Sequence, residues 1–270
     1  MYPIGRLANL HGGSRGSSPP TAYADDMINA DEVLDGRGAI LAATGHHPFV
    51  RHSLPIHEPA KGWRRAGAVC WLLTVEQGPI GGVIGPSDTA IDLVSTLVTE
   101  GRLGAGRWLH LPRTDPAPLG PAVAGYEDWD FLWTTGAPPA QPGEERVVRL
   151  TEADHPALTA LIDEAFPTST ARPGSPQVRG WYGIRDGDRL VACGADRTRG
   201  EVGFLAGLAV APQHRGRGLG AAITTGMTRA LLDRYGMVAL GVYPSNVTAI
   251  RLYRRLGYAD TFPLTSVRFV

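Results

Sequence analysis

The feature that most constrains the fold is an apolar run that leads directly into a glycine-rich turn. The run spans residues 201–210, and the turn that follows reads Arg-Gly-Arg-Gly-Leu-Gly at 215–220. Apolar residues then recur every four positions from Leu219 to Leu231, which predicts a helix that ends near Gly236. We therefore expect an inner strand covered on both faces, then a tight turn, then a helix.

The glycine turn predicts an anion site. Gly216, Gly218 and Gly220 carry no side chains, so a ligand can approach the backbone closely. The N–H groups of such a turn and the positive end of the following helix converge on one point, where a phosphate can bind. Arg215 and Arg217 add positive charge at the rim. A plain tight turn without a ligand is the alternative.

Two cofactors compete for this turn. Gly216, Gly218 and Ala221 match the dinucleotide pattern G-x-G-x-x-G/A, which would indicate NAD or FAD. That pattern expects an acidic residue about 20 positions later, to bind the ribose. The next apolar run, residues 237–243, contains no carboxylate. A dinucleotide-dependent oxidoreductase is therefore the weaker reading.

The segment after that run predicts a short helix that begins at Ser245 or Asn246 and ends at Gly257. Asn246 and Tyr253 are seven residues apart, so they fall on one helix face, about 10 Å apart along the axis. An amide and a phenol in this position can contact two points of an extended ligand. Alternatively, Asn246 caps the helix and Tyr253 is a core aromatic.

Together these motifs resemble the GNAT superfamily of acetyl-CoA-dependent N-acetyltransferases. The match comprises Leu-Ala-Val at 208–210, R-x-x-G-x-G at 215–220, and Asn246, Tyr253, Gly257 and Tyr258. It covers about residues 146–270. The resemblance implies an α/β fold of the α+β GNAT type, an acetyltransferase with acetyl-CoA as acyl donor and no metal, and an amine of a small molecule or peptide as acceptor.

The resemblance also implies which residues act. The backbone of Leu208, Ala209 and Val210 would bind the pantetheine arm, and a backbone N–H near Val210 would stabilise the oxyanion. Asn246 would contact the pantetheine, and Tyr253 would protonate the departing thiolate, since a phenol with a pKa near ~10 is protonated at neutral pH. The pyrophosphate would be held by Arg215, Gly216, Arg217, Gly218, Leu219, Gly220 and Ala221.

The general base is less clear. Some relatives carry a glutamate on the strand before the Asn, but the matching position here is Gly241. Glu201, at the start of the strand before the turn, is the candidate base, and an exposed carboxylate at a strand end is the alternative. Glu164 and Asp163 are weaker candidates. Because no base is obvious, a non-catalytic acyl-CoA-binding protein remains an alternative function.

At 270 residues the chain favours two domains, although one large domain is possible. The order strand, helix, strand in the first half repeats that of the second, so we expect two tandem domains, for which the resemblance implies a mixed central β-sheet flanked by helices. Residues 1–20 are expected to be a disordered lead, because they are rich in Gly, Ser and Pro. Residues 21–135 are expected to form a degenerate GNAT-like domain without a cofactor site. A Pro- and Gly-rich linker at 136–145 then leads to the catalytic GNAT domain at 146–270.

The first half is predicted to contain helices at 22–34 and 87–100, with strands at 68–75, 78–84, 107–111 and 129–133. In place of the glycine turn it reads Gly-Pro-Ser-Asp-Thr at 85–89, where Ser87 or Asp88 can cap the helix. Asp88 would place negative charge where pyrophosphate should bind. We therefore expect this half to shape the acceptor site or a dimer contact.

Charge and cysteine content exclude several function classes. Residues 1–140 carry a net charge of −4 and residues 141–270 one of +4, too little for nucleic-acid binding. No apolar run approaches the ~18 residues that cross a membrane. Cys70 and Cys193 form no metal or redox motif, and we expect them to be buried free thiols in a reducing cytoplasm.

Overall fold

The computed structural model describes residues 31–73 and 79–270. The elements of the first half are β1 Glu32–Asp35, α1 Gly36–Ala43, α2 Pro48–Ser53, β2 Ala60–Arg65, β3 Ala68–Leu73, β4 Pro79–Ile84, α3 Ser87–Thr99, β5 Trp108–Pro112 and β6 Val123–Thr134. Those of the second half are β7 Val148–Leu150, α4 His155–Ala165, β8 Gly180–Asp186, β9 Arg189–Asp196, β10 Gly203–Val210, α5 Leu219–Tyr235, β11 Val238–Val242, α6 Val247–Arg255 and β12 Asp260–Phe269.

All of these strands join in one twelve-stranded sheet, in the order β1-β2-β3-β4-β5-β12-β6-β11-β10-β9-β8-β7. The sheet is mixed, because β4 pairs parallel with β5 and β10 parallel with β11, while the other pairs are antiparallel. The predicted mixed sheet flanked by helices is confirmed. The two predicted sheets, however, are continuous with each other at their shared edge.

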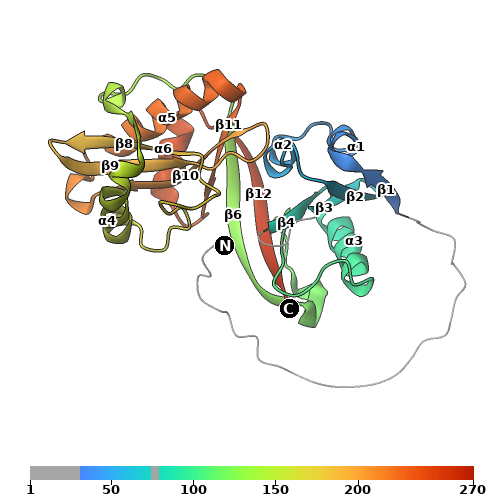
Figure 1. Ribbon diagram of the computed structural model, residues 1–270. Coiled ribbons are helices and arrows are strands. Elements are labelled where there is room, and N and C mark those ends of the chain that lie inside the picture. Colours follow the sequence, from blue (N-terminus) through green and yellow to red (C-terminus); the bar gives the residue numbers. More distant parts are fainter. Residues whose placement is uncertain (1–30, 74–78) are drawn as a thin grey trace, which may run out of the picture.

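The two halves exchange their last strands at the centre of the sheet. β6 comes from the first half, yet it pairs with β11 of the second, with Leu132 opposite Leu240. The C-terminal strand β12 in turn lies between β6 and β5. Figure 1 shows β6 and β12 as two long strands running side by side between the two halves of the molecule. Each half is therefore completed by a strand of the other.

An aromatic cluster packs across the junction of the halves. Phe49 of α2 lies 5.4 Å from Phe131 of β6 between ring centroids, and Phe131 stacks on Phe204 of β10 at 6.3 Å. His52 stacks on the Phe204 ring at 4.2 Å and lies 5.3 Å from the Phe131 ring. Aromatic rings bury large apolar areas and favour such tilted or offset contacts. The cluster thus stabilises the position of β10 relative to the first half.

The second half follows the predicted pattern closely. Leu219, Ile223, Met227 and Leu231 are all buried on one side of α5, as their spacing of four requires. The helix ends at Gly236, which adopts the left-handed conformation expected of a C-terminal glycine. Both cysteines are buried free thiols, as predicted.

Two predictions for the first half are wrong. The expected lead at 1–20 lies entirely outside the described residues, and so does most of the helix expected at 22–34. Within that expected helix, residues 32–34 instead belong to strand β1 at 32–35, because this segment pairs with β2. Helix α3 is not capped by a side chain of Ser87 or Asp88, since its N-cap position is Pro86. Within residues 31–73 and 79–270, no helix has the length and apolar character needed to cross a membrane.

Candidate active site

A gap opens in the sheet between β10 and β11. The two parallel strands pair only over residues 203–205 and 238–240, after which they diverge. At the same level β10 bulges between Ala206 and Ala209, with Gly207 at a φ of 58°. A Cβ on Gly207 would lie 2.9 Å from that of Ala171, so a glycine is required here. The exposed edge of β10 is therefore free to bind an extended ligand.

Backbone alternation decides which groups face this gap. Beyond the bulge β10 still pairs with β9, and the N–H of Ala211 donates to the carbonyl of Val191 at 2.9 Å. Successive backbone groups of a strand point to opposite sides, so those of Leu208 and Val210 point away from β9, into the gap. The carbonyl of Val210 accepts from Nε of Arg215 at 3.3 Å.

The glycine turn leaves the start of α5 without a side-chain cap. Gly216 and Gly218 have φ values of 75° and 78°, and Gly218 is the N-cap residue, which has no side chain to accept a hydrogen bond. The N–H of Ala222 donates to the carbonyl of Gly218 at 3.0 Å, as the first bond within the helix. The N–H groups of the preceding helix residues have no acceptor in the helix and point at the turn. They are the N–H groups at which the sequence predicts an anion site.

The gap and the turn open into one cleft with a volume of about 680 Å³. This lies within the range of about 300–1,000 Å³ that is usual for small-molecule sites. Except for Arg217, which is exposed, the predicted cofactor-binding residues all line it: Leu208, Ala209, Val210, Arg215, Gly216, Gly218, Leu219, Gly220, Ala221 and Asn246. The structure thus brings residues from three elements together at one site.

Asn246 and Tyr253 differ in their position. Asn246 caps α6, because its Oδ1 accepts from the N–H of Ala249 at 3.2 Å, and it also lines the cleft. Tyr253 is only 9% exposed and is not among the described residues that line the cleft. Its ring lies 6.1 Å from that of Tyr258. Burial raises the pKa of Tyr253 to about 12, so the phenol is protonated at neutral pH.

Glu201 lies away from the cleft, and its predicted role as base is not supported. It precedes β10 at the end opposite the turn, and its carboxylate forms ion pairs with Nη2 of Arg37 at 2.7 Å and Nε of Arg51 at 3.1 Å. Partial burial alone would raise its pKa, but hydrogen bonds and charge from the two arginines outweigh burial and lower it. Glu201 therefore ties the halves together rather than accepting a proton in the cleft.

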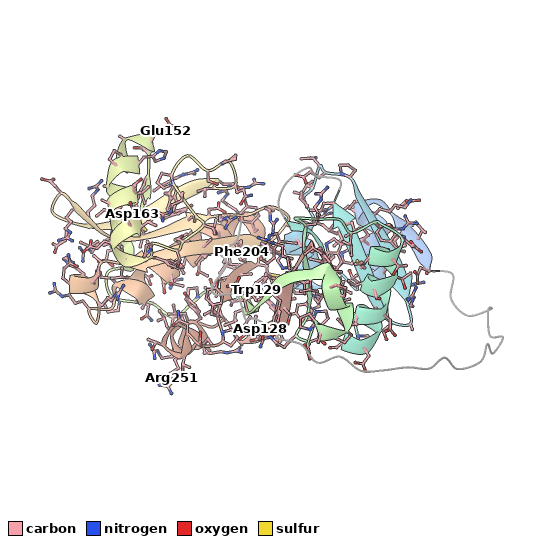
Figure 2. All side chains as sticks on the ribbon, turned by 90° about the horizontal axis from the view of Figure 1, so that it is seen from below. Asp128, Trp129, Glu152, Asp163, Phe204 and Arg251 are labelled. Atoms are coloured by element: carbon pink, nitrogen blue, oxygen red, sulfur yellow. The ribbon has the colours of Figure 1, made fainter. Side chains whose placement is uncertain are left out.

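The weaker candidates on α4 are engaged as well. Asp163 binds Nη1 of Arg172 at 2.5 Å, and Glu164 binds Nη2 of Arg189 at 3.3 Å. Figure 2 shows Asp163 on α4, well apart from Trp129 and Phe204 near the middle of the molecule. Neither carboxylate is among the described residues that line the cleft.

A second, smaller cavity continues from the cleft beyond the bulge. Its volume is about 130 Å³, and Phe166 lines both spaces. Ala206 and Gly207 of β10 form one side, and Trp129 and Glu127 of β6 contribute from the first half. The first half thus helps to line the space beside the cleft. We call this space the junction cavity.

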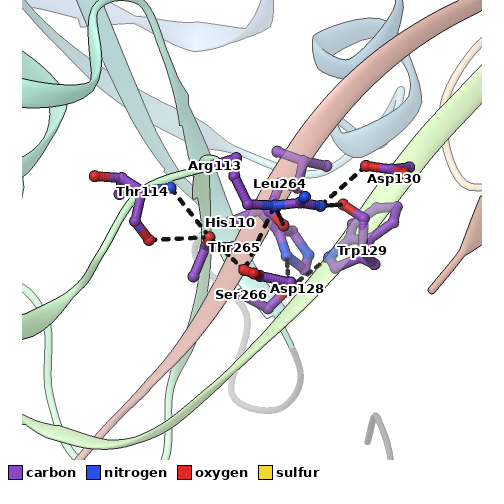
Figure 3. A network of polar contacts seen from close by, with 9 residues as sticks. All are labelled: His110, Arg113, Thr114, Asp128, Trp129, Asp130, Leu264, Thr265 and Ser266. Atoms are coloured by element: carbon purple, nitrogen blue, oxygen red, sulfur yellow. Dashed lines mark hydrogen bonds and ion pairs between the residues drawn. The ribbon is translucent and has the colours of Figure 1, made fainter. Parts of the chain in front are cut away.

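The indole of Trp129 is fixed by a buried polar network, shown in Figure 3. Its Nε1–H donates to Oγ of Ser266 at 2.7 Å, and Ser266 lies 2.7 Å from Nδ1 of His110. Burial and the charge of Arg199 lower the pKa of His110 to about 3, so the ring is neutral. The Ser266 hydroxyl therefore bridges the indole and the imidazole, and the tautomer of His110 decides which of Nδ1 and Oγ donates.

The fixed position of the Trp129 indole explains why residue 241 is a glycine. A Cβ at that position would lie 3.1 Å from Cε3 of Trp129, so the indole occupies the space that a longer side chain would need. A glutamate cannot stand there without displacing Trp129. The carboxylate that sequence reasoning missed is on the neighbouring strand, at Glu127. The sequence carries no signal for it, because its position depends on the pairing of β6 with β11.

The model of the acetyltransferase (GNAT) family matches residues 146–258. Residues 146–258 are a GNAT acetyltransferase domain. Acyl-CoA-dependent acetyl transfer is the general activity of this family, and acetyl-CoA is its substrate. A comparison with curated proteins gave no match. Within the described ranges, no group of three or more His, Cys, Asp or Glu side chains could hold a metal ion.

The whole GNAT-containing chain also resembles solved structures in fold. A protein described as a GNAT-family acetyltransferase from Novosphingobium aromaticivorans is 24% identical, with a TM-score of 0.52, over 84% of this chain and 94% of the other. A Drosophila protein is 15% identical with a TM-score of 0.52, over 87% and 86%. A tandem GNAT protein from the clavulanic acid biosynthesis pathway is 13% identical with a TM-score of 0.43, over 88% and 98%.

Proposed function

We propose that this protein is an N-acetyltransferase that binds acetyl-CoA in the cleft and transfers the acetyl group to an amine of a small molecule or peptide. The observation that carries the proposal is the convergence of two backbone features on one cleft. The uncapped start of α5 suits the pyrophosphate, and the free edge of β10 suits the amides of the pantetheine arm. The thioester would then lie near the bulge of β10.

The reaction would be a direct attack within a ternary complex. The amine nitrogen forms a bond to the thioester carbonyl, and the C–S bond breaks as the intermediate collapses. Backbone N–H groups at the free edge of β10 would stabilise the oxyanion. Tyr253 would donate a proton to the departing thiolate, because its phenol is protonated at neutral pH. Because Tyr253 is not among the described residues that line the cleft, the substitution Tyr253→Phe tests this role directly.

The test is to measure binding and transfer separately. Calorimetry with acetyl-CoA should show saturable binding, and release of free thiol should follow when a panel of amines is added. Binding without thiol release from any amine would favour the alternative, a non-catalytic acyl-CoA-binding protein. Thermal stabilisation by NAD or FAD, but not by CoA, would contradict the proposal and favour the oxidoreductase.

A further inference from the structure

The junction cavity offers a defined site for the acceptor, if the proposed function holds. The cavity and the cleft follow one another along β10, because Ala206 and Gly207 line the cavity and the next residues, 208–210, line the cleft. An amine in the cavity would therefore approach a thioester held near the bulge.

The walls of this cavity are mainly apolar and aromatic. Four aromatic rings line it, those of Trp129, Phe166, Phe204 and Tyr243, and Gly241 contributes only backbone. The volume of about 130 Å³ is close to the ~150 Å³ of an engineered apolar cavity that binds benzene. Such walls select a body of about that size and disfavour charged groups, which would lose their hydration there.

One carboxylate faces this apolar space. Glu127 and Trp129 lie two residues apart on β6, so their side chains are on the same face of the sheet. Burial raises the pKa of Glu127, although a hydrogen bond from the Tyr243 hydroxyl opposes this. Arg197 also borders the cavity, but its Nη1 donates to Oγ1 of Thr170 at 3.1 Å and its Nη2 to Oε1 of Gln177. The site thus offers a carboxylate for a cation rather than a free cation for a carboxylate.

We infer that the acceptor is a primary amine with a compact, uncharged, apolar body about the size of a benzene ring, and that Glu127 receives its ammonium group and acts as general base. Glu127 takes one proton from the ammonium and later releases it to solvent. The free amine attacks the thioester, the C–S bond breaks, and Tyr253 gives its proton to the thiolate. The second proton leaving the nitrogen restores the Tyr253 phenol.

The experiment compares three probes in the thiol-release assay with the full chain. 2-Phenylethylamine fits the inference, phenylalanine adds a carboxylate to the same body, and spermidine is a polar polycation. We expect kcat/KM for 2-phenylethylamine to exceed that of the other two by about 100-fold. Glu127→Gln should lower kcat/KM for it by about 10²–10⁴-fold and leave the Kd of acetyl-CoA unchanged. Glu164→Gln, which changes an exposed carboxylate on α4, should leave both values unchanged.

The outcomes separate the two proposals. Equal or faster transfer to spermidine or phenylalanine, or a Glu127→Gln variant as fast as the parent, would overturn this inference while acetyl transfer still stands. Transfer to no amine despite acetyl-CoA binding would overturn both. A Glu127→Gln variant that no longer binds acetyl-CoA would also contradict the inference, because Glu127 would then support the fold of the cleft.

Discussion

Gly220 provides the sharpest test of the phosphate site, because the protein itself does not need a glycine there. It is the second residue of α5 and has no positive φ. A Cβ at this position would meet Cδ2 of Leu252 at 3.6 Å, which is ordinary van der Waals contact. Gly218 is less suitable, because its φ of 78° would add backbone strain to any side chain.

The substitution Gly220→Ala should therefore change stability and affinity in opposite directions. Alanine in place of glycine in a helix raises the free energy of unfolding by up to about 1 kcal/mol, which corresponds to a Tm higher by about 2–4 °C for a protein of this size. If phosphate lies against the backbone here, the added methyl group disrupts at least one charge-assisted hydrogen bond, worth about 1.5–3 kcal/mol. The Kd of CoA should then rise by about 10–150-fold.

Calorimetry with CoA and thermal unfolding without ligand measure the two effects. Gly38→Ala is the matched control, because Gly38 lies inside α1 with nothing within 4 Å of a Cβ. It should give a similar gain in Tm with an unchanged Kd. A Gly220→Ala variant that binds CoA as tightly as the parent would show that no phosphate approaches α5 at this point, and the reasoning on the uncapped helix would fail.

Three further substitutions test individual side chains. Tyr253→Phe should slow acetyl transfer by about 10²–10⁴-fold with the Kd of CoA unchanged, whereas an unchanged rate would leave Tyr253 a core residue only. Glu201→Gln should lower the free energy of unfolding by about 1 kcal/mol at pH 7, because two partly exposed ion pairs are lost. Since folding lowers the pKa of Glu201, this difference is present above the unfolded value of about 4.3 and should vanish in urea titrations as the pH falls through the lower folded pKa. Ser266→Ala should cost about 1–3 kcal/mol, because the buried Nε1–H of Trp129 loses its acceptor, and a smaller loss in urea unfolding would contradict the network.

The second half could be predicted well because its signals are local. The apolar spacing of α5, the glycines of the turn and the cap at Asn246 all act between residues close in sequence, and each is found where the pattern places it. The first half gave fewer such signals. Residues 32–35 became a strand only because β2 lies beside them, which no local pattern reveals.

The predicted general base, Glu201, lies away from the cleft because of contacts at long range in the sequence, which no local pattern reveals. The place of Glu201 on the strand before the turn favours it as base, but its carboxylate forms ion pairs with Arg37 and Arg51 of the first half. The sequence around Glu127 does not predict that its carboxylate lines the junction cavity beside Tyr243. Both outcomes follow from contacts between the halves, about 100 residues or more apart in the chain.

The exchanged strand offers a physical reason for the arrangement of the site. In the second half alone, β11 would present Gly241 at an open edge of the sheet. β6 covers that edge instead, and the indole of Trp129 fills the space over Gly241. The same strand then brings Glu127 to the cavity that Trp129 helps to form. Strand β6 thus supplies both an aromatic wall of the junction cavity and its carboxylate. In the proposed function, the first half would therefore determine which amine reaches a cofactor that the second half holds.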